Sequence, residues 1–422
     1  MIKKIDILDS ISSILLKVFF VIALFCPIST TMEGARYYPY YPEFLLVNAV
    51  AVFFWGVYIL SLFAHRRWNR ENKVFCVKFF VLIILYYFFY RVAQLTIQWD
   101  WQGWNGLVSF GLFLFLMMGL NMEWIQKHRV IRFINRAIVV SHVVAILVYL
   151  KGNLAVYWYD FKLKFITDSI RRYGEIRYNW IYVHKSQYAL MVLLAMAFII
   201  TYRKEFYNKI TFIISLIILE VAICISHTNA AIVGSLILLT GFVLDYLVNN
   251  YKKMQFRIRV LGSCITVLVL TSISRILFLK IQSERSIIDL GGRVYIWKHS
   301  IETILNNARG IGNQFTLMPI LIPEWNGQHV TNAHNFFLNE FLRFSIPVGI
   351  CFTMLFILII TYSLEKKFSF LTVGIWVAVI ISWMMDYAVL VSGWTLMLIY
   401  FYFIFFIHLD QNKELVGGKK DE

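Results

Sequence analysis

Apolar residues along the chain are gathered into long runs, which short polar segments separate. A run of about 20 apolar residues has the length that an α-helix needs to cross a ~30 Å hydrocarbon core. Because lipid offers backbone groups no hydrogen-bond partner, helices are the default structure for such runs, and a closed barrel is the other solution. The pattern predicts twelve membrane-spanning helices, at residues 11–29, 44–64, 74–90, 104–122, 137–150, 187–202, 210–226, 230–248, 260–278, 345–363, 370–386 and 388–408.

The composition supports this fold class. Of the 422 residues, 60% are hydrophobic and 15% are charged, whereas a soluble domain has about 45–50% apolar and about 25% charged residues. We therefore expect an all-α polytopic membrane protein. The net charge of +16 could suggest nucleic acid, but the basic residues stand at the ends of the apolar runs. That distribution is typical of topology signals and of contacts with membrane lipids, so no nucleic-acid partner is expected.

Lysine and arginine concentrate in every second connecting segment, starting with residues 1–10. By the positive-inside rule, this places both termini in the cytoplasm. Two segments on the opposite side nevertheless carry many basic residues, seven at 151–186 and six at 279–344. A phosphate or diphosphate bound outside the membrane would explain them; headgroup binding or solvation of a long loop is the alternative. The chain thus divides into helices one to nine (1–278), a large extracytoplasmic loop (279–344), and helices ten to twelve with a cytoplasmic tail (345–422).

The large loop contains an amphipathic stretch. Apolar residues recur at helical spacing over 293–305, which predicts a helix there: Val294, Trp297, Ile301, Ile304 and Leu305. With tryptophan on its apolar face, this helix is expected to lie along the outer membrane surface. An arginine, Arg293, would stand in its first turn, where a positive charge opposes the helix dipole. We therefore expect an anion or an acidic partner to compensate that charge.

A second helix is predicted just before the tenth span, in "TNAHNFFLNEF" at 331–341. Asn332 or Thr331 is a good N-cap, so the helix should begin at Ala333 and run into the tenth span, with a kink at Pro347.

The helix start would then contain His334 and Asn335. The positive end of a helix disfavours an imidazolium, so the histidine should stay neutral and could act as a general base on a hydroxyl group. Backbone N–H groups at the same end could hold an oxyanion. The alternative is a histidine packed at the membrane interface and bonded to a backbone carbonyl.

The pattern "GGRVYIWKHSI…GIGNQF…AHNFFLNEFLRFSIPVGI", over residues 290–350, resembles the signature region of the O-antigen polymerase and O-antigen ligase superfamily. That signature has G-R with a tryptophan a few residues on, then G-x-G, then H-N before a span. The resemblance implies about twelve spans, both termini cytoplasmic, and a large extracytoplasmic loop between spans nine and ten.

The resemblance further implies a metal-independent, cofactor-free glycosyltransferase of the cytoplasmic membrane, acting on its extracytoplasmic face. Its donor would be an oligosaccharide on undecaprenyl diphosphate, and its acceptor a glycan or lipid A-core. His334 becomes the base for the acceptor hydroxyl, and Arg293 a ligand of the diphosphate. The stretch "RRYGEIRYNWIYVHKSQYAL" at 171–190 is similar to a weaker family pattern.

Further substrate-binding residues follow from the resemblance. Many relatives carry an arginine in the turn between spans seven and eight, where this chain has Asn229 with His227 beside it. Another arginine from the basic loop could supply the missing charge. The predicted substrate-binding residues are therefore Asn335, Arg172, Arg177, Lys185, His184, His227 and Asn229.

Three functions remain open. Ser345 stands where ligases often show a glycine, which favours a polymerase of O-antigen or a capsule-like polysaccharide over a ligase. A chain-length regulator would be a possible partner of the polymerase, besides membrane lipids. A transporter or flippase should show charged or discontinuous helices near mid-membrane, and the chain has few such charges.

His329 and His334 are poorly spaced for a metal site, and no Asp or Cys completes one.

Overall fold

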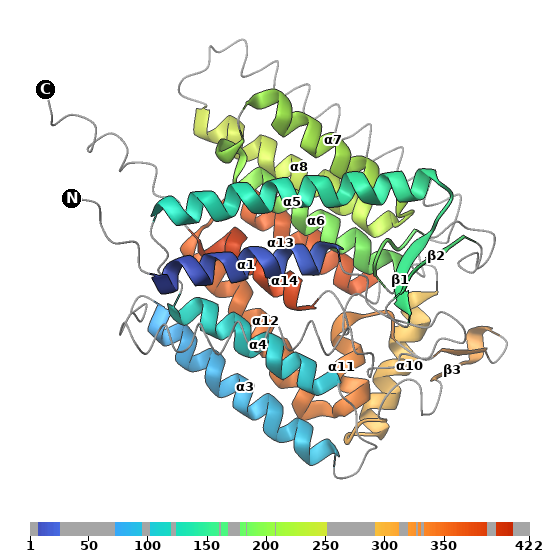
Figure 1. The fold of residues 1–422 in the computed structure, drawn as a ribbon. Helices are drawn as coiled ribbons and strands as arrows, with labels where there is room; N and C mark the ends of the chain where they lie inside the picture. Colours follow the sequence, from blue (N-terminus) through green and yellow to red (C-terminus); the bar gives the residue numbers. More distant parts are fainter. Residues whose placement is uncertain are drawn as a thin grey trace, which may run out of the picture.

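The computed structural model describes residues 7–25, 72–94, 102–119, 124–159, 162–167, 178–182, 184–206, 208–250, 292–311, 320–325, 328–330, 333–385 and 394–407. Helices dominate this part of the chain (Figure 1). They are α1 (Ile7–Phe25), α3 (Lys73–Gln94), α4 (Gln102–Gly119), α5 (Trp124–Leu150), α6 (Lys185–Thr201), α7 (Lys209–Ile225), α8 (Asn229–Asn250), α10 (Arg293–Asn306), α11 (Phe336–Phe344), α12 (Ile346–Lys366), α13 (Phe370–Met385) and α14 (Trp394–Phe401).

Each predicted span coincides with one of these helices, except 44–64 and 260–278, which lie outside the described residues. Within the part of the chain that the structure describes, four helices are long and apolar enough to cross a membrane, namely Lys73–Ala93, Lys127–Leu150, Asn229–Asn250 and Ile346–Lys366. Shorter apolar helices, such as α6 and α13, accompany them. The described residues therefore have the character of a helical membrane protein, as the apolar runs predict.

Helix α5 begins at Trp124, well before the predicted start at residue 137. Its first turns are basic, but Ile131 and Ile134 on the same turns are buried. The apolar face of α5 therefore extends to residues before the predicted span. The Arg132 Nε atom donates to the Glu205 carboxylate at 3.0 Å, which joins this extension to the short 3-10 helix η2 (Arg203–Glu205). Packing and an ion pair thus stabilise a helix at residues 124–136, where the basic residues alone did not predict one.

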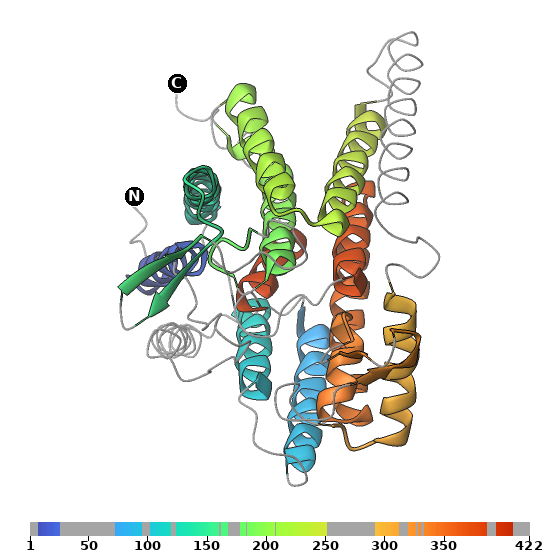
Figure 2. The ribbon, with the colours of Figure 1, turned by 90° about the vertical axis from the view of Figure 1, so that its right-hand side faces the viewer.

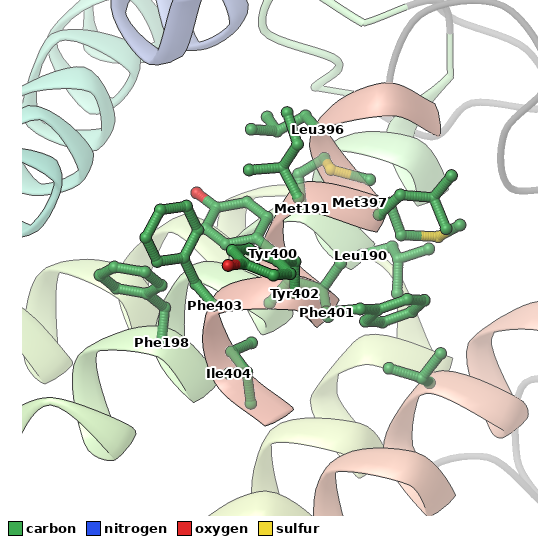
Figure 3. Close-up of a cluster of buried hydrophobic side chains, with 14 of the residues drawn as sticks. Leu190, Met191, Phe198, Leu396, Met397, Tyr400, Phe401, Tyr402, Phe403 and Ile404 are labelled. Atoms are coloured by element: carbon green, nitrogen blue, oxygen red, sulfur yellow. The ribbon is translucent and has the colours of Figure 1, made fainter. Parts of the chain in front are cut away.

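Helix α6 is the central element, and its residues from Ser186 to Ile200 are all buried. A helix that is hydrophobic all round is expected at such a place. Figure 3 shows its Phe198 beside Tyr400 and Phe403, with ring centroids 5.9 Å from each. The last two residues belong to α14 and to the π-helix η5 (Tyr402–Phe406) that continues it.

Helices α8 and α13 pack closely through small residues. A Cβ atom on Gly241 would stand 2.6 Å from the carbonyl oxygen of Phe370, so only glycine fits there. The Asp245 carboxylate accepts hydrogen bonds from the backbone N–H of Phe370 at 2.8 Å and of Leu371 at 3.1 Å. Small residues that let backbones approach are typical of helix pairs in membranes.

The two basic connecting segments, 151–186 and 279–344, each contain a β-hairpin. Strands β1 (Ala155–Tyr159) and β2 (Lys162–Ile166) form an antiparallel pair, as do β3 (Ile320–Ile322) and β4 (Gln328–Val330), with the 3-10 helix η4 (Pro323–Trp325) between the latter two. Valine and three consecutive aromatic residues in β1, Val156 to Tyr159, have high strand propensity, which is the signal for this strand in the sequence.

Both hairpins lie at the same end of the helical bundle as α10 and α11, on the right of Figure 1. Figure 2 views α1 and α5 nearly along their axes, whereas α10 runs across the view. We call the assembly of α10, β3, η4, β4 and α11 the α10–α11 layer. It lies at one end of the bundle, where α11 contacts α12 and α13.

Candidate functional site

The α10–α11 layer has a small hydrophobic core of its own. Ile296 and Ile304 of α10 are buried against Ile320 and Ile322 of β3 and Leu342 of α11. The predicted helix over 293–305 is confirmed, because α10 spans Arg293–Asn306. The layer is therefore a folded unit that fixes how α10 lies against α11.

Only part of the predicted apolar face of α10 packs in the layer, because Ile304 is buried and other predicted positions are exposed. Ile296 is buried, whereas Val294 is 41% exposed, Ile301 46% and Leu305 70%. The helix thus has apolar residues on two sides, one in the layer core and one on the surface. Contact of the surface side with the membrane remains an expectation.

Arg293 is the first residue of α10, as predicted. Gly292 before it has φ +83°, the left-handed region, and its carbonyl accepts from the Ile296 N–H at 3.3 Å. Glycine reaches this conformation without the penalty that a Cβ atom brings. The glycine of "GGR" therefore turns the chain into α10 and sets where the half-buried Arg293 stands.

The glycine of "GIG" joins α10 to α11. Gly310 has φ +85°, and a Cβ atom there would lie 2.7 Å from the carbonyl oxygen of Arg343. The next residue, Ile311, donates its N–H to the Leu342 carbonyl at 2.7 Å, and Ile346 donates to Ala308 at 3.1 Å. These bonds satisfy the Leu342 carbonyl at the end of α11 and the Ile346 N–H at the start of α12, groups that helix ends leave without partners.

Helix α11 does not begin where the sequence predicts. It starts at Phe336 with Asn335 as its N-cap, and His334 lies before the helix with φ +46°. The prediction of a start at Ala333, with His334 and Asn335 in the first turn, is wrong. The predicted caps at 331–332 lie outside the described residues. His334 still stands beside the positive end of the helix.

The asparagine of the H-N pair has a structural task. Asn335 Oδ1 accepts from the N–H groups of Phe337 at 3.0 Å and Leu338 at 3.1 Å. The expectation that N–H groups at this helix end hold an oxyanion is therefore wrong for these two. Asn339 Oδ1 accepts from the Ala333 N–H at 2.8 Å. These bonds on both sides hold His334 in a conformation that is costly for a residue other than glycine.

The predicted kink at Pro347 is a full break between two helices. Ser345, with φ +148°, separates α11 from α12. Its Oγ atom accepts from the Val348 N–H at 3.4 Å and so caps α12. Pro347 stands in the first turn of α12, where a missing N–H is tolerated. The chain can therefore change direction between the α10–α11 layer and the tenth predicted span.

A second group of predicted residues meets at the starts of α6 and α8. Lys185 Nζ donates to the His227 carbonyl at 2.9 Å. His184 is the N-cap of α6, its Nδ1 accepting from the Ser186 N–H at 3.3 Å, and Asn229 opens α8. Loop 151–186 and the α7–α8 turn are therefore in contact, whereas Arg172 and Arg177 lie outside the described residues.

Helix α13 connects the two groups. Phe336 of α11 stacks on Trp383 of α13, with ring centroids 4.9 Å apart and planes at 10°. The same helix packs along α8 through Gly234, where a Cβ atom would lie 3.4 Å from Ala378 Cβ. The residues around His334 and those around His227 are thus attached to one rigid element at the same end of the bundle.

No protein-family model and no curated protein matches the chain. A function for the site must therefore rest on the chemistry of its residues. Within the described ranges, no three His, Cys, Asp or Glu residues lie close enough together to hold a metal ion.

The sequence did not reveal a set of buried polar residues on α11. Asn339 is 2% exposed, Glu340 0% and Arg343 2%. Arg343 counted among the basic residues of loop 279–344, and it is a buried residue rather than a surface cation. The spacing of these residues from Phe336, at three, four and seven positions, was the available signal, because such positions share one helix face.

Two spans also exchange a polar contact. Ser235 Oγ of α8 donates to the Glu220 carboxylate of α7 at 3.3 Å. A carboxylate within an apolar helix thus has a partner on the neighbouring helix.

Proposed function

We propose that the chain is an integral membrane glycosyltransferase that joins oligosaccharide repeat units carried on undecaprenyl diphosphate. The product would be O-antigen or a capsule-like polysaccharide. The observation that carries the proposal is the α10–α11 layer, because it gathers the three pieces of the G-R, G-x-G and H-N pattern into one folded unit. Arg293 opens α10, Gly310 packs on the end of α11, and His334 precedes its start.

His334 is the proposed general base. Such a base must be held within reach of the hydroxyl whose proton it takes, and Asn335 and Asn339 hold the backbone on both sides of His334. In the proposed step the acceptor hydroxyl oxygen forms a bond to the anomeric carbon of the donor. The bond from that carbon to the diphosphate oxygen breaks, the hydroxyl proton passes to His334, and the lipid diphosphate leaves with the electron pair.

Arg293 is the proposed ligand of the leaving diphosphate. A guanidinium offers paired donors that match phosphate oxygens, and positive charge near a leaving group stabilises the charge that develops there. Lys185, beside His227 at the start of α6, is a second cation at this end of the bundle. Positive side chains from two separate loops thus support a diphosphate as the anion.

We propose that this end of the bundle faces the extracytoplasmic side of the cytoplasmic membrane, in a protein of twelve spans with both termini in the cytoplasm. The first turns of α5 support this orientation. Arg129, Arg132 and Arg136 are exposed there, and α5 runs from them to β1 at the other end (Figure 1). Basic residues concentrate on the cytoplasmic side of membrane proteins.

A deletion strain complemented with wild-type or His334→Ala chain tests the proposal through its glycans. If the chain is a polymerase, the deletion leaves lipid A-core with a single repeat unit, and the variant fails to restore polymer. A bare core with polymer retained on the carrier lipid indicates the ligase instead. Purified protein that forms no glycosidic bond from lipid-linked donor, with repeat units trapped inside the deletion strain, indicates a transporter and contradicts the proposal.

A further inference from the structure

His299 of α10 lies between two carboxylates. Its Nδ1 is 2.9 Å from Glu302 Oε2 on the same helix, and its Nε2 is 2.8 Å from Glu324 Oε2 on η4. The histidine side chain is only 14% exposed. Glu324 also faces Lys298 Nζ, which is 3.8 Å from its other oxygen. A histidine thus connects α10 to a segment 25 residues further along the chain.

Both ring nitrogens of His299 must donate in this arrangement. A neutral imidazole has one N–H, and its other nitrogen can only accept, whereas an ionised carboxylate can only accept. Glu302 is 53% exposed and Glu324 29% exposed, and carboxyl groups in contact with water are ionised at neutral pH. Two donated bonds therefore require the imidazolium form. Hydrogen bonds between ionised groups are roughly twice as strong as neutral ones.

The environment of Glu324 agrees with this. Its own backbone N–H, and then the His299 side chain with its charge and that of Lys298, hold the pKa of the Glu324 carboxyl below its ordinary value. The other titratable groups of α10 are Arg293, at its start, and Tyr295. Strand β3 (Ile320–Ile322) carries none.

Helix α11 meets α10 through apolar side chains, Leu338 and Leu342. The ionisable groups of α11 are Glu340 and Arg343, both buried, and β4 carries His329.

We propose that His299 is a positioning residue that fixes α10, and through it Arg293, against η4, and that loss of its second N–H loosens this contact. Arg293 lies six positions before His299, ~9 Å along the helix axis, so a shift of a rigid α10 moves both. The link to Arg293 as a diphosphate ligand rests on the proposed function. The bridge itself does not, since it needs only the three side chains.

Amide hydrogen exchange of the full chain in lipid nanodiscs tests the bridge. Exchange of residues 293–306 and 320–325 is compared at pH 6 and pH 8.5, after correction for intrinsic rates. We expect roughly tenfold more protection at pH 6 in the wild type, the effect of a charge-assisted hydrogen bond. His299→Arg keeps a cation that can donate to both carboxylates, so its protection should be high at both pH values. A glutamine side chain is neutral and has one donor nitrogen. The α10 and η4 amides of His299→Gln should therefore be poorly protected at both pH values.

His128→Gln is the matched control, because His128 also contacts a carboxylate, that of Glu205, but on α5 and η2. It should leave the exchange of α10 unchanged. Wild-type protection that does not vary with pH, or a His299→Gln chain that keeps the wild-type pH dependence, would overturn the bridge.

The same variants separate the bridge from the proposed function. The KM for lipid-linked donor should rise from pH 6 to pH 8.5 in the wild type and stay constant in His299→Arg. If exchange behaves as expected but no variant forms glycosidic bonds, the bridge stands and the glycosyltransferase is wrong. If bonds form and KM has the same pH dependence in His299→Arg as in the wild type, the link from His299 to Arg293 is wrong.

Discussion

The Lys185 ammonium group donates to the carbonyl oxygen of His227 across a separation of 42 residues, at 2.9 Å. The contact ties the start of α6 to the turn before α8, where His227 has φ +50°. A left-handed conformation at a residue other than glycine needs support from its surroundings. Lys185 therefore supports the backbone of the α7–α8 turn, besides bringing positive charge to it.

Replacing Lys185 should test these two effects together. Lys185→Met removes the charge and the donor, so we expect activity to fall at least tenfold, mainly through a higher KM for the donor. Lys185→Arg keeps a charged donor and should retain most activity. Steady-state kinetics of purified protein with lipid-linked donor measures both. Wild-type kinetics in Lys185→Met would remove this residue from the binding site.

Asn335→Ala should lower both stability and activity. Loss of the N-cap of α11 is expected to cost ~1 kcal/mol, and it releases the backbone beside His334. Asn208→Ala is the matched control, because Asn208 Oδ1 caps α7 by accepting from the Thr211 N–H at 2.8 Å. Thermal unfolding in detergent should show similar losses for both variants, with activity lost far more in Asn335→Ala. Equal activities would mean that the cap does not place His334.

Gly310→Ala should destabilise the α10–α11 layer. The substitution adds the penalty of a left-handed alanine, roughly 1–2 kcal/mol, and a clash, since the Cβ atom would lie 2.7 Å from the Arg343 carbonyl oxygen. Gly152→Ala is the control: Gly152 has φ +83°, but nothing lies within 4 Å of its Cβ position. Unfolding midpoints should fall in both variants and further in Gly310→Ala. The same midpoint in both would show that the layer absorbs the clash.

Arg293→Lys should lose most activity while the protein stays folded. A lysine keeps the charge but replaces a planar fork of donors by a single point charge, which binds phosphate oxygens less specifically. We expect kcat/KM to fall by one to two orders of magnitude, since one charge-assisted contact is worth about 1.5–3 kcal/mol. Arg309→Lys, at an exposed arginine after the same helix, should behave as wild type. Undiminished kcat/KM in Arg293→Lys would exclude the residue from the diphosphate site.

Acid should weaken the layer through Glu324. The pKa of this carboxyl is lowered in the folded protein, so its contribution to stability is present above the ordinary pKa of a glutamate and is lost as pH falls through the lowered value. Hydrogen exchange of residues 320–325 in the wild type should therefore become faster as pH falls through the lowered pKa of Glu324, after correction for intrinsic rates. Glu324→Gln should remove this acid dependence and leave exchange faster at neutral pH. If exchange in Glu324→Gln still becomes faster at low pH as in the wild type, another group is responsible for the acid dependence.

Much of the layer could be predicted from sequence. The 3.6-residue periodicity of 293–305 predicts α10, and its start at Arg293 follows from the glycines before it. The start of α11 could not be predicted with the same accuracy, because Asn332 and Asn335 are both good caps. The choice of Asn335 depends on Asn339, whose side chain holds Ala333 outside the helix. That contact exists only once α11 has formed.

His299 and His334 also show that some features follow from the sequence and others only from the structure. His299 stands among polar residues of an amphipathic helix and carries no signal in the sequence, since its partner Glu324 comes from another element. His334 drew attention through its pattern, but its left-handed backbone conformation appears only in the structure.

The sequence by itself determined the helical membrane class, the approximate places of most of the described helices and the two basic segments, because hydrophobic length, periodicity and charge are properties of consecutive residues. Only the tertiary structure decided which residues meet. It brought Lys185 to His227, Gly310 to the end of α11 and Glu324 to His299. Such contacts depend on the packing of elements that are distant along the chain, so the local sequence pattern does not predict them.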